Sequence, residues 1–308
     1  MSSVESTNVL VDLSARLSGA VDRAGEHIVA IHARRRIPSS GIVWRDGVIV
    51  SASHTVRHDG EVRITLPSGK QAEANVVGRD PATDLAVLRA AGVTAAQFAE
   101  PDESKVGSLV LAVGRPGRNV TASFGIVSAA IDGWRSGSGA RIERVLRLDL
   151  SVYDGFSGGP LVAPSGQVIG INNSALARGG AAALPASVVD GVVDELLSRG
   201  HIRRPFIGIG VHPVALGPAI VKRHGLRTEA ALVVVSVAEG EAAEAAGVLI
   251  GDVLVGVAGE PVSRPADLLD VLASVADGGA IELTVLRGGA KESVTIVPRD
   301  RDRGGAVE

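Results

Sequence analysis

A serine in a glycine-rich segment is the strongest sign of chemistry in this chain of 308 residues. The segment runs from Asp154 to Pro160 and reads DGFSGGP, with Ser157 at its centre. Glycines let the backbone turn tightly enough to aim successive N–H groups at one point, which a hydrolase needs to stabilise an oxyanion. A glycine-rich turn with an incidental serine would read the same way. The segment alone therefore leaves both interpretations open.

The pattern G-x-S-x-G also occurs at the nucleophile elbow of α/β-hydrolases, so that fold has to be considered. An elbow requires a strand, a turn and a helix, with the acid and the histidine after the serine. Here Ser157 is followed by Pro160, an apolar pair, the turn Pro164–Gly166 and the apolar run VIGI. These residues predict a hairpin, so we do not expect an elbow.

The other order of a serine triad is histidine, then aspartate, then serine, as found on β-barrels. His54 follows the apolar run GVIVSAS, and Asp84 directly precedes the apolar run LAVL. A single histidine at a strand end is ordinarily a surface residue. A histidine and an aspartate at strand ends, upstream of Ser157 and in this order, instead favour nucleophilic hydrolysis.

The composition excludes several other kinds of site. The chain has no Cys, which rules out disulfides, thiolate-bound zinc, iron–sulfur clusters and a cysteine nucleophile. Two Trp, one Tyr and four Phe are too few for a surface that stacks nucleic-acid bases. The net charge of −3 gives no general attraction to phosphate. We expect no cofactor, no metal and no nucleic-acid partner.

Short apolar runs separated by turn signals fill residues 41–173 and predict a β-sandwich or β-barrel. Apolar spacing predicts a weak amphipathic helix within residues 12–32 that runs into a strand, and a helix at 187–199 that stops at Gly200. Residues 200–205 are the natural linker. The second unit is expected to contain strands at Ile207–His212, Leu232–Val237, Val253–Val257, Ile281–Leu286 and Glu292–Val297, and helices at Glu241–Ala246 and Ala266–Ser274.

At these landmarks the chain resembles the HtrA/Deg family of serine proteases. The resemblance covers about residues 28–298 and is specific because many motifs occur together. They are SGIV at 40–43, VIVSASHTV at 48–56, DPATDLAVL at 80–88, AVGRP at 112–116, GIVSA at 125–129, GFSGGPLV at 155–162 and GQVIGIN at 166–172. It implies a mainly β protein, with a chymotrypsin/trypsin-like double β-barrel followed by an α+β PDZ domain. The implied domains are an N-terminal segment at 1–27, the protease at 28–200, the PDZ domain at 205–298 and a disordered tail at 299–308.

The resemblance also implies roles for individual residues. Ser157 would be the nucleophile, His54 the general base and acid, and Asp84 the group that holds the imidazole tautomer. The oxyanion hole would consist of the amides of Gly155 and Ser157, with Phe156 between them at a position where the family usually has Asn.

The residues before Ser157 also bear on the primary specificity pocket, which holds the substrate side chain next to the scissile bond. In trypsin-like folds the residues before the nucleophile help to form the floor of this pocket. Ser151, six positions before Ser157, is not an acid, so selection for Lys or Arg is not expected. We expect a small or medium aliphatic side chain in the pocket, which Tyr153 would narrow.

Phe206, Ile207, Gly208 and Ile209 resemble the carboxylate-binding loop of an HtrA-type PDZ domain. Gly208 lets neighbouring N–H groups converge, and the strand that follows leaves an open edge to which a C-terminal peptide can add. The implied protein is a serine endopeptidase that acts on unfolded or specific protein substrates and is regulated by such peptides. The alternative is a catalytically silent or gated peptide-binding scaffold with a pseudo-protease barrel.

The N-terminal residues bear on location and assembly. They include Glu5 and lack the basic start of a signal peptide, and no apolar run approaches the ~20 residues that cross a bilayer. We therefore expect a cytoplasmic protein as written, or an exported one if an upstream signal was lost.

Family trimers form through N-terminal aromatics, whereas the first aromatic here is Trp44. The sequence therefore leaves open whether the chain forms a homo-oligomer such as a trimer.

Overall fold

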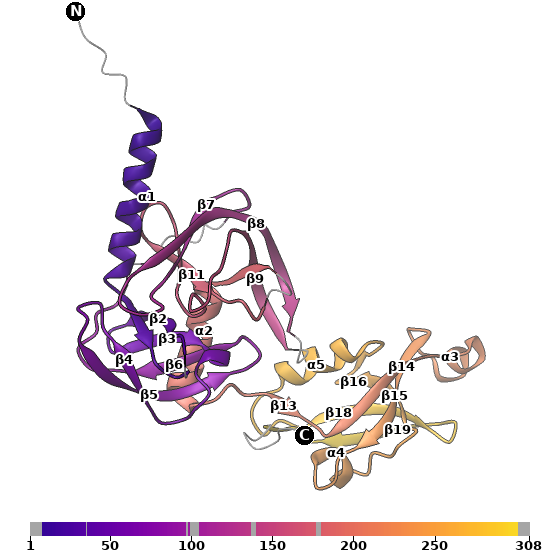
Figure 1. Cartoon of the computed structure of the whole chain (residues 1–308). Helices are drawn as coiled ribbons and strands as arrows, with labels where there is room; N and C mark the ends of the chain where they lie inside the picture. Colours follow the sequence, from indigo (N-terminus) through magenta and orange to yellow (C-terminus); the bar gives the residue numbers. More distant parts are fainter. Residues whose placement is uncertain are drawn as a thin grey trace, which may run out of the picture. The chain divides into compact units, whose positions relative to one another are not determined.

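The computed structural model describes residues 8–34, 36–96, 98, 105–136, 140–176 and 180–300. The chain divides into two compact units, with the division between Ile202 and Arg203 (Figure 1). Most of the predicted disordered tail, residues 301–308, lies outside the described residues. Arg299 and Asp300, which were expected to belong to that tail, instead form the short strand β20.

Twelve strands of the first unit close into two antiparallel barrels, in the orders β1-β2-β3-β6-β5-β4 and β10-β11-β12-β9-β8-β7. The double β-barrel expected from the sequence is thereby confirmed. The strands of the first barrel are β1 (Ile28–Ile31), β2 (Ser39–Arg45), β3 (Val48–Ala52), β4 (Glu61–Thr65), β5 (Gln71–Asp80) and β6 (Leu85–Arg89). Those of the second are β7 (Leu109–Gly114), β8 (Thr121–Arg135), β9 (Arg141–Asp149), β10 (Pro160–Val162), β11 (Val168–Asn172) and β12 (Ala181–Pro185).

Aliphatic side chains fill both barrels, as the shortage of aromatic residues requires. Ile49 and Leu88 belong to the cluster inside the first barrel, and Leu146 and Leu161 to the cluster inside the second. A third buried cluster joins the barrels to each other and includes the ring of Trp44. This packed apolar cluster holds the two barrels in a fixed relation to each other.

Helix α2 (Ala186–Arg199) contacts strands of both barrels and ends at Gly200, which has the left-handed φ of +75° typical of a helix stop. The indole of Trp44 donates a hydrogen bond to Asp190 at 2.8 Å. Arg45 pairs with Asp190 at 3.1 Å and with Asp194. These contacts tie the C-terminal helix of the unit to the first barrel.

Helix α1 (Val9–Gly25) begins three residues before the range that the sequence indicated, and strand β1 follows it as the pattern over 12–32 predicted. The side chain of Asn8 caps its first turn by accepting a hydrogen bond from the amide of Val11. At its other end, the buried guanidinium of Arg115 donates to the carbonyl oxygens of Gly25 and Ile28 at 2.8 Å. These bonds hold the turn between the end of the helix and the start of β1.

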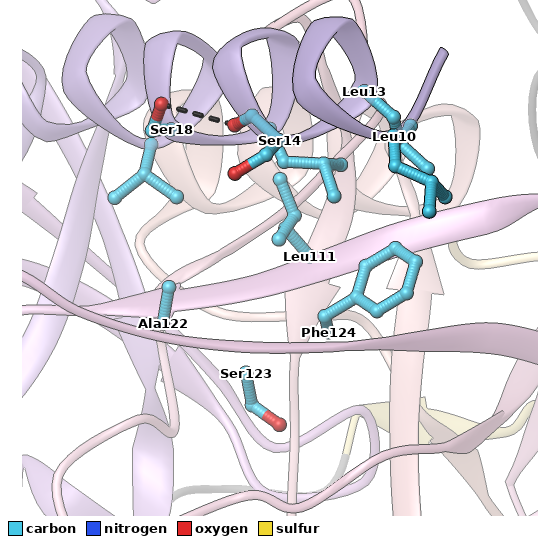
Figure 2. Close-up of a pocket in the computed structure, with 10 residues that line it drawn as sticks. Leu10, Leu13, Ser14, Ser18, Leu111, Ala122, Ser123 and Phe124 are labelled. Atoms are coloured by element: carbon cyan, nitrogen blue, oxygen red, sulfur yellow. Dashed lines mark hydrogen bonds between the residues drawn. The ribbon is translucent and has the colours of Figure 1, made fainter. Parts of the chain in front are cut away.

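Figure 2 shows α1 lying over strands β7 and β8, with Leu10 and Leu13 above Leu111 and Phe124. The groove between them has a volume of about 400 Å³. Leu10 is 76% exposed, and the start of the helix extends beyond the barrels (Figure 1). None of the described helices combines the length and apolar character that crossing a bilayer requires.

The second unit is a six-stranded sheet with helices, in which β14 and β19 are the two edges of the main strand order β14-β15-β16-β18-β19. This confirms the α+β PDZ architecture. Its strands are β13 (Pro205–Phe206), β14 (Ile209–Ala215), β15 (Ala230–Val237), β16 (Val253–Val257), β17 (Glu260–Pro261), β18 (Ile281–Arg287), β19 (Ala290–Ile296) and β20 (Arg299–Asp300). Its helices are α3 (Pro218–His224), α4 (Ala242–Ala245) and α5 (Pro265–Ser274).

Two details of this unit differ from the sequence-based expectation. The strand predicted at Ile207–His212 begins only at Ile209, because Gly208 adopts a left-handed φ of +82° that interrupts the extended backbone. Helix α3 was not predicted. None of its residues is buried, so its sequence carries no apolar stripe.

Candidate active site

The pairing of two strands brings His54 and Asp84 together. Strands β3 and β6 are antiparallel neighbours, with Ala52 opposite Leu85 at the end of the ladder. His54 lies two residues after Ala52, in the short 3-10 helix η1 (Ser53–Thr55), and Asp84 lies one residue before Leu85. Both side chains therefore lie at the same end of the first barrel.

The carboxylate of Asp84 contacts His54 through both of its oxygens. Oδ2 lies 2.5 Å from His54 Nδ1, and Oδ1 accepts a hydrogen bond of 2.7 Å from the backbone amide of His54. An ionised carboxylate only accepts, so the proton of this contact belongs to Nδ1. Nε2 is then left as the basic nitrogen of the neutral ring. The side chain of His54 is 34% exposed, and that of Asp84 is 8% exposed.

Asp84 has a left-handed backbone with a φ of +56°, which is uncommon for a residue other than glycine. Its carbonyl oxygen accepts hydrogen bonds from the amide of Ser53 at 2.9 Å and from the side chain of Asn173 at 3.3 Å. Asn173 follows β11 of the second barrel and is fully buried. The unusual conformation is thus held from both barrels, and the sequence analysis did not identify Asn173.

The glycines beside Ser157 are required by close packing against the first barrel. Gly158 has a φ of +86°, and a Cβ atom there would lie 2.3 Å from the carbonyl oxygen of Ser40. Gly155 has a φ of +89°, and a Cβ atom there would lie 2.7 Å from the carbonyl oxygen of Pro38, just before β2, and 2.6 Å from Pro116 Cβ of the second barrel. A residue with a side chain at either position would strain the backbone and displace the loop.

Two amides in this loop have no acceptor within the part of the chain that the structure describes: those of Gly155 and Ser157. The amide between them, that of Phe156, donates to the carbonyl of Tyr153 at 3.0 Å. Backbone N–H groups left free in this way are the donors that an oxyanion hole needs. The carbonyl of Gly155 is held in turn by the hydroxyl of Ser40, which donates to it at 2.6 Å.

Phe156, the residue directly before Ser157, has its side chain inside the protein. The side chain of Phe156 is fully buried, and its ring packs edge-on against Tyr153 with the centroids 5.4 Å apart. It fits beside Gly114, where an added Cβ atom would lie 2.9 Å from the ring. Tyr153 is itself 57% exposed. Phe156 is therefore accommodated in a buried position between Gly114 and Tyr153.

The hydroxyl of Ser157 contacts another serine. Its Oγ lies 2.9 Å from Oγ of Ser174, which follows β11. Among the described residues, no hydrogen bond joins Ser157 to His54. The structure thus pairs His54 with Asp84 and places Ser157 in a loop with two free amides, but it turns the hydroxyl toward Ser174. No motif in the sequence pointed to Ser174.

A cavity of about 360 Å³ opens beside His54 and Asp84. Small and apolar residues make up much of its wall, including Pro81, Ala82 and Leu176. The described part of the chain contains no cluster of three or more His, Asp or Glu side chains that could hold a metal ion. The site contains a serine hydroxyl, an imidazole paired with a carboxylate, and unpaired amides, which are the kinds of group that carry out acyl transfer.

In the second unit, the predicted carboxylate-binding loop lies between β13 and β14. The amides of Ile207 and Gly208 donate no hydrogen bond within the described residues, while strand β14 beside them is a sheet edge. The side chain of Ile207 is 2% exposed and belongs to the core, so this residue can offer a ligand only its backbone. Phe206 lies in β13, and Ile209 begins β14.

Comparison with known families gives one match for each unit. Residues 39–171 match the model of the trypsin-like peptidase domain, and residues 205–297 match that of the PDZ domain. Among curated proteins, the chain is 36% identical over 273 residues to a probable periplasmic serine endoprotease DegP-like from Rhizobium meliloti, covering 85% of this chain and 53% of that protein. It is 34% identical over 290 residues to a protein of the same name from Brucella suis, covering 89% and 56%.

The chain spans about half the length of the curated relatives it matches. Both relatives are named as periplasmic, which makes the expectation of a cytoplasmic protein wrong. That expectation rested only on the lack of a signal-peptide pattern in the first residues of the sequence, and such an absence does not decide where a protein acts.

Solved structures are similar over nearly the whole chain. The HtrA-type protease AlgW with a decapeptide has a TM-score of 0.71 at 25% identity, covering 93% of this chain and 99% of that one. The serine endoprotease from Yersinia pestis has a TM-score of 0.74 at 27% identity, covering 93% and 98%.

Proposed function

The chain belongs to the HtrA/Deg family of trypsin-like serine proteases with a PDZ domain, and we propose that it is itself a serine endopeptidase whose triad is His54, Asp84 and Ser157. One observation carries this proposal: His54 pairs with Asp84 at the end of the first barrel, and the loop that holds Ser157 and two free amides packs against that barrel at Ala52, two residues before His54. The substrates proposed are unfolded or specific protein chains.

The chemistry follows from these groups. Nε2 of His54 takes the proton of the Ser157 hydroxyl as Oγ attacks the carbonyl carbon of the scissile bond. The amides of Gly155 and Ser157 stabilise the resulting oxyanion, and protonated His54 then passes its proton to the leaving amine. Water repeats the sequence and releases the acid. Throughout, Asp84 keeps the proton on Nδ1 and stabilises the charged ring.

We propose that the side chain preceding the scissile bond is small or medium and aliphatic. Ser151, at the position where an acid would select Lys or Arg, is exposed, and its amide donates to the hydroxyl of Ser123 at 3.2 Å. Tyr153 would limit the size of the side chain that can enter.

The PDZ domain is proposed to bind C-terminal peptides that regulate the protease. The free amides of Ile207 and Gly208 suit a terminal carboxylate, and the open edge of β14 suits an added peptide strand. AlgW, a structural neighbour, is described in complex with a decapeptide, which supports peptide binding by proteins of this kind.

A catalytically silent scaffold is the less favoured function. Loss of catalysis would leave no reason to keep Asp84 in a left-handed conformation with a φ of +56° or to keep both loop amides unpaired. We also propose that the chain acts outside the cytoplasm, like its curated relatives. Immunodetection in the periplasmic fraction of the source cells tests this location.

The proposed activity is tested with an unfolded protein substrate and full-length enzyme, with and without C-terminal peptides. Wild type should cleave the substrate, whereas Ser157→Ala should retain only the residual catalysis of binding and the oxyanion hole, roughly 10³–10⁴-fold over water. Equal turnover by the two proteins, or none by wild type under any of these conditions, would contradict the proposal.

A further inference from the structure

The nucleophile is engaged by a residue outside the triad. Oγ of Ser157 lies 2.9 Å from Oγ of Ser174, and the described residues contain no hydrogen bond from Ser157 to His54. The side chain of Ser157 is almost buried, at 6% exposure, while Ser174 lies on the exposed side of the contact. The hydroxyl that must attack a substrate is thus turned toward a surface serine.

The position of Ser174 is set by rigid backbone. Asn172 lies two residues before Ser174. Its carbonyl oxygen accepts a hydrogen bond from the amide of Gly158 at 3.0 Å, and its amide donates one to the carbonyl oxygen of Gly159 at 2.8 Å. Asn173 donates its amide to the carbonyl of Ala182 at 2.8 Å, and its side chain accepts from the amide of Ala175 at 3.0 Å. The backbone on both sides of Ser174 is therefore held in place. Because the serine side chain is short, its hydroxyl has few other positions and stays near that of Ser157.

We propose that Ser174 is a positioning residue that holds the hydroxyl of Ser157 away from His54 until substrate binds. This inference rests on the proposed protease function. A serine hydroxyl has one proton, and proton transfer requires that Oγ of Ser157 point at His54. Rotation of the Ser157 side chain toward His54 breaks the contact with Ser174.

Substrate binding can break the contact between Ser174 and Ser157. Ser174 directly precedes Ala175 and Leu176, which line the cavity beside His54. A peptide main chain lying in that cavity presents amide and carbonyl groups beside the exposed Ser174 hydroxyl. When that hydroxyl bonds to the substrate instead, Ser157 is free to turn toward His54. The contact thus keeps the empty enzyme less reactive than the occupied one.

The test measures the second-order rate constant for labelling of the full-length protein by a small fluorophosphonate, which reacts with the activated serine and does not need the peptide cavity. Ser174→Ala removes the competing hydroxyl and should speed labelling by about 2- to 10-fold, the effect of one neutral hydrogen bond on a rate. Ser174→Thr keeps a hydroxyl and should restore a rate close to that of wild type.

Two controls complete the design. Ser198→Ala removes an exposed hydroxyl whose one hydrogen bond among the described residues goes to the carbonyl of Glu195 in its own helix, so its labelling rate should equal that of wild type. Ser157→Ala should not be labelled. The contact between two neutral hydroxyls does not titrate, so the rate ratio of Ser174→Ala to wild type should stay constant across the pH profile. A general loosening of the loop would instead lower the rate and the melting temperature.

The outcomes separate this inference from the proposed function. Labelled wild type with an equal or slower Ser174→Ala variant overturns the role of Ser174 and leaves the protease assignment standing. A failure of Ser174→Thr to return the rate toward wild type also overturns the role of its hydroxyl. Absence of labelling in folded wild type and in Ser174→Ala overturns both proposals.

Discussion

Asp84 accepts two hydrogen bonds from His54, one from the ring at 2.5 Å and one from the backbone amide at 2.7 Å. The backbone bond fixes the carboxylate relative to the start of the histidine side chain, and the ring bond then fixes the imidazole. A single aspartate therefore sets both the orientation and the tautomer of the proposed base.

Replacement of Asp84 by Asn tests this relationship. Asn also tolerates a left-handed backbone, so the fold should be retained. Its amide can donate a hydrogen bond to an unprotonated Nδ1, which favours the tautomer whose proton lies on Nε2, so that Nε2 cannot act as a base. We expect kcat to fall by about 10⁴-fold with little change in KM. A variant with more than a tenth of the wild-type kcat would show that Asp84 does not control the tautomer.

The hydroxyl of Ser40 holds the oxyanion loop, and its removal should weaken catalysis. Ser40 is fully buried, donates to the carbonyl of Gly155 at 2.6 Å and accepts from the amide of Arg115 at 2.7 Å. Ser40→Ala leaves two buried groups unpaired, which should cost about 1–3 kcal/mol of unfolding free energy. We expect kcat to fall by roughly 10-fold, less than the loss of a whole oxyanion donor.

Ser39 provides a matched control one residue away. Its side chain is also buried, but its hydroxyl has no hydrogen-bond partner in the described structure. Ser39→Ala should therefore leave kcat and the urea midpoint close to those of wild type. If both alanine variants behaved alike, the contact between Ser40 and Gly155 would have no role in the site.

The stability of the PDZ domain should depend on Asp267 and on pH. Burial raises the pKa of this carboxyl, but hydrogen bonds from Ser263 and Arg264 outweigh it and lower the pKa from 3.8 to about 2. These bonds cap the start of helix α5. Because the folded state has the lower pKa, the stabilisation is present above about pH 4 and is lost as the pH falls toward 2.

Asp267→Ala should accordingly reduce the unfolding free energy by about 1–2 kcal/mol at pH 7, as the loss of a helix cap does. The difference from wild type should shrink between pH 4 and pH 2, where the wild-type carboxylate becomes protonated. Urea unfolding of the full chain at several pH values measures it, followed through the transition of the PDZ domain. If the difference in unfolding free energy between wild type and Asp267→Ala were constant over this range, the charged carboxylate of Asp267 would not be its cause.

The sequence was most informative where a single element decides the geometry. His54 and Asp84 flank paired strands, and the glycines around Ser157 reflect a close approach of backbone to backbone, so residue type and position sufficed. Ser174 and Asn173 could not be found in this way. Ser174 meets a side chain 17 residues away, and Asn173 meets a carbonyl 89 residues away in the other barrel. The first contact depends on the pairing of β10 with β11 inside the second barrel, and the second on the packing of the two barrels against each other.

The central claim is that Ser157 is the residue that becomes acylated, and locating the adduct of a fluorophosphonate by peptide mass spectrometry tests it most directly. Ser174 is a stringent internal comparison, since its hydroxyl lies only 2.9 Å from that of Ser157. The account predicts one adduct, on Ser157, that disappears when His54 is replaced by Ala. An adduct on Ser174, or a folded protein that remains unlabelled, would contradict it.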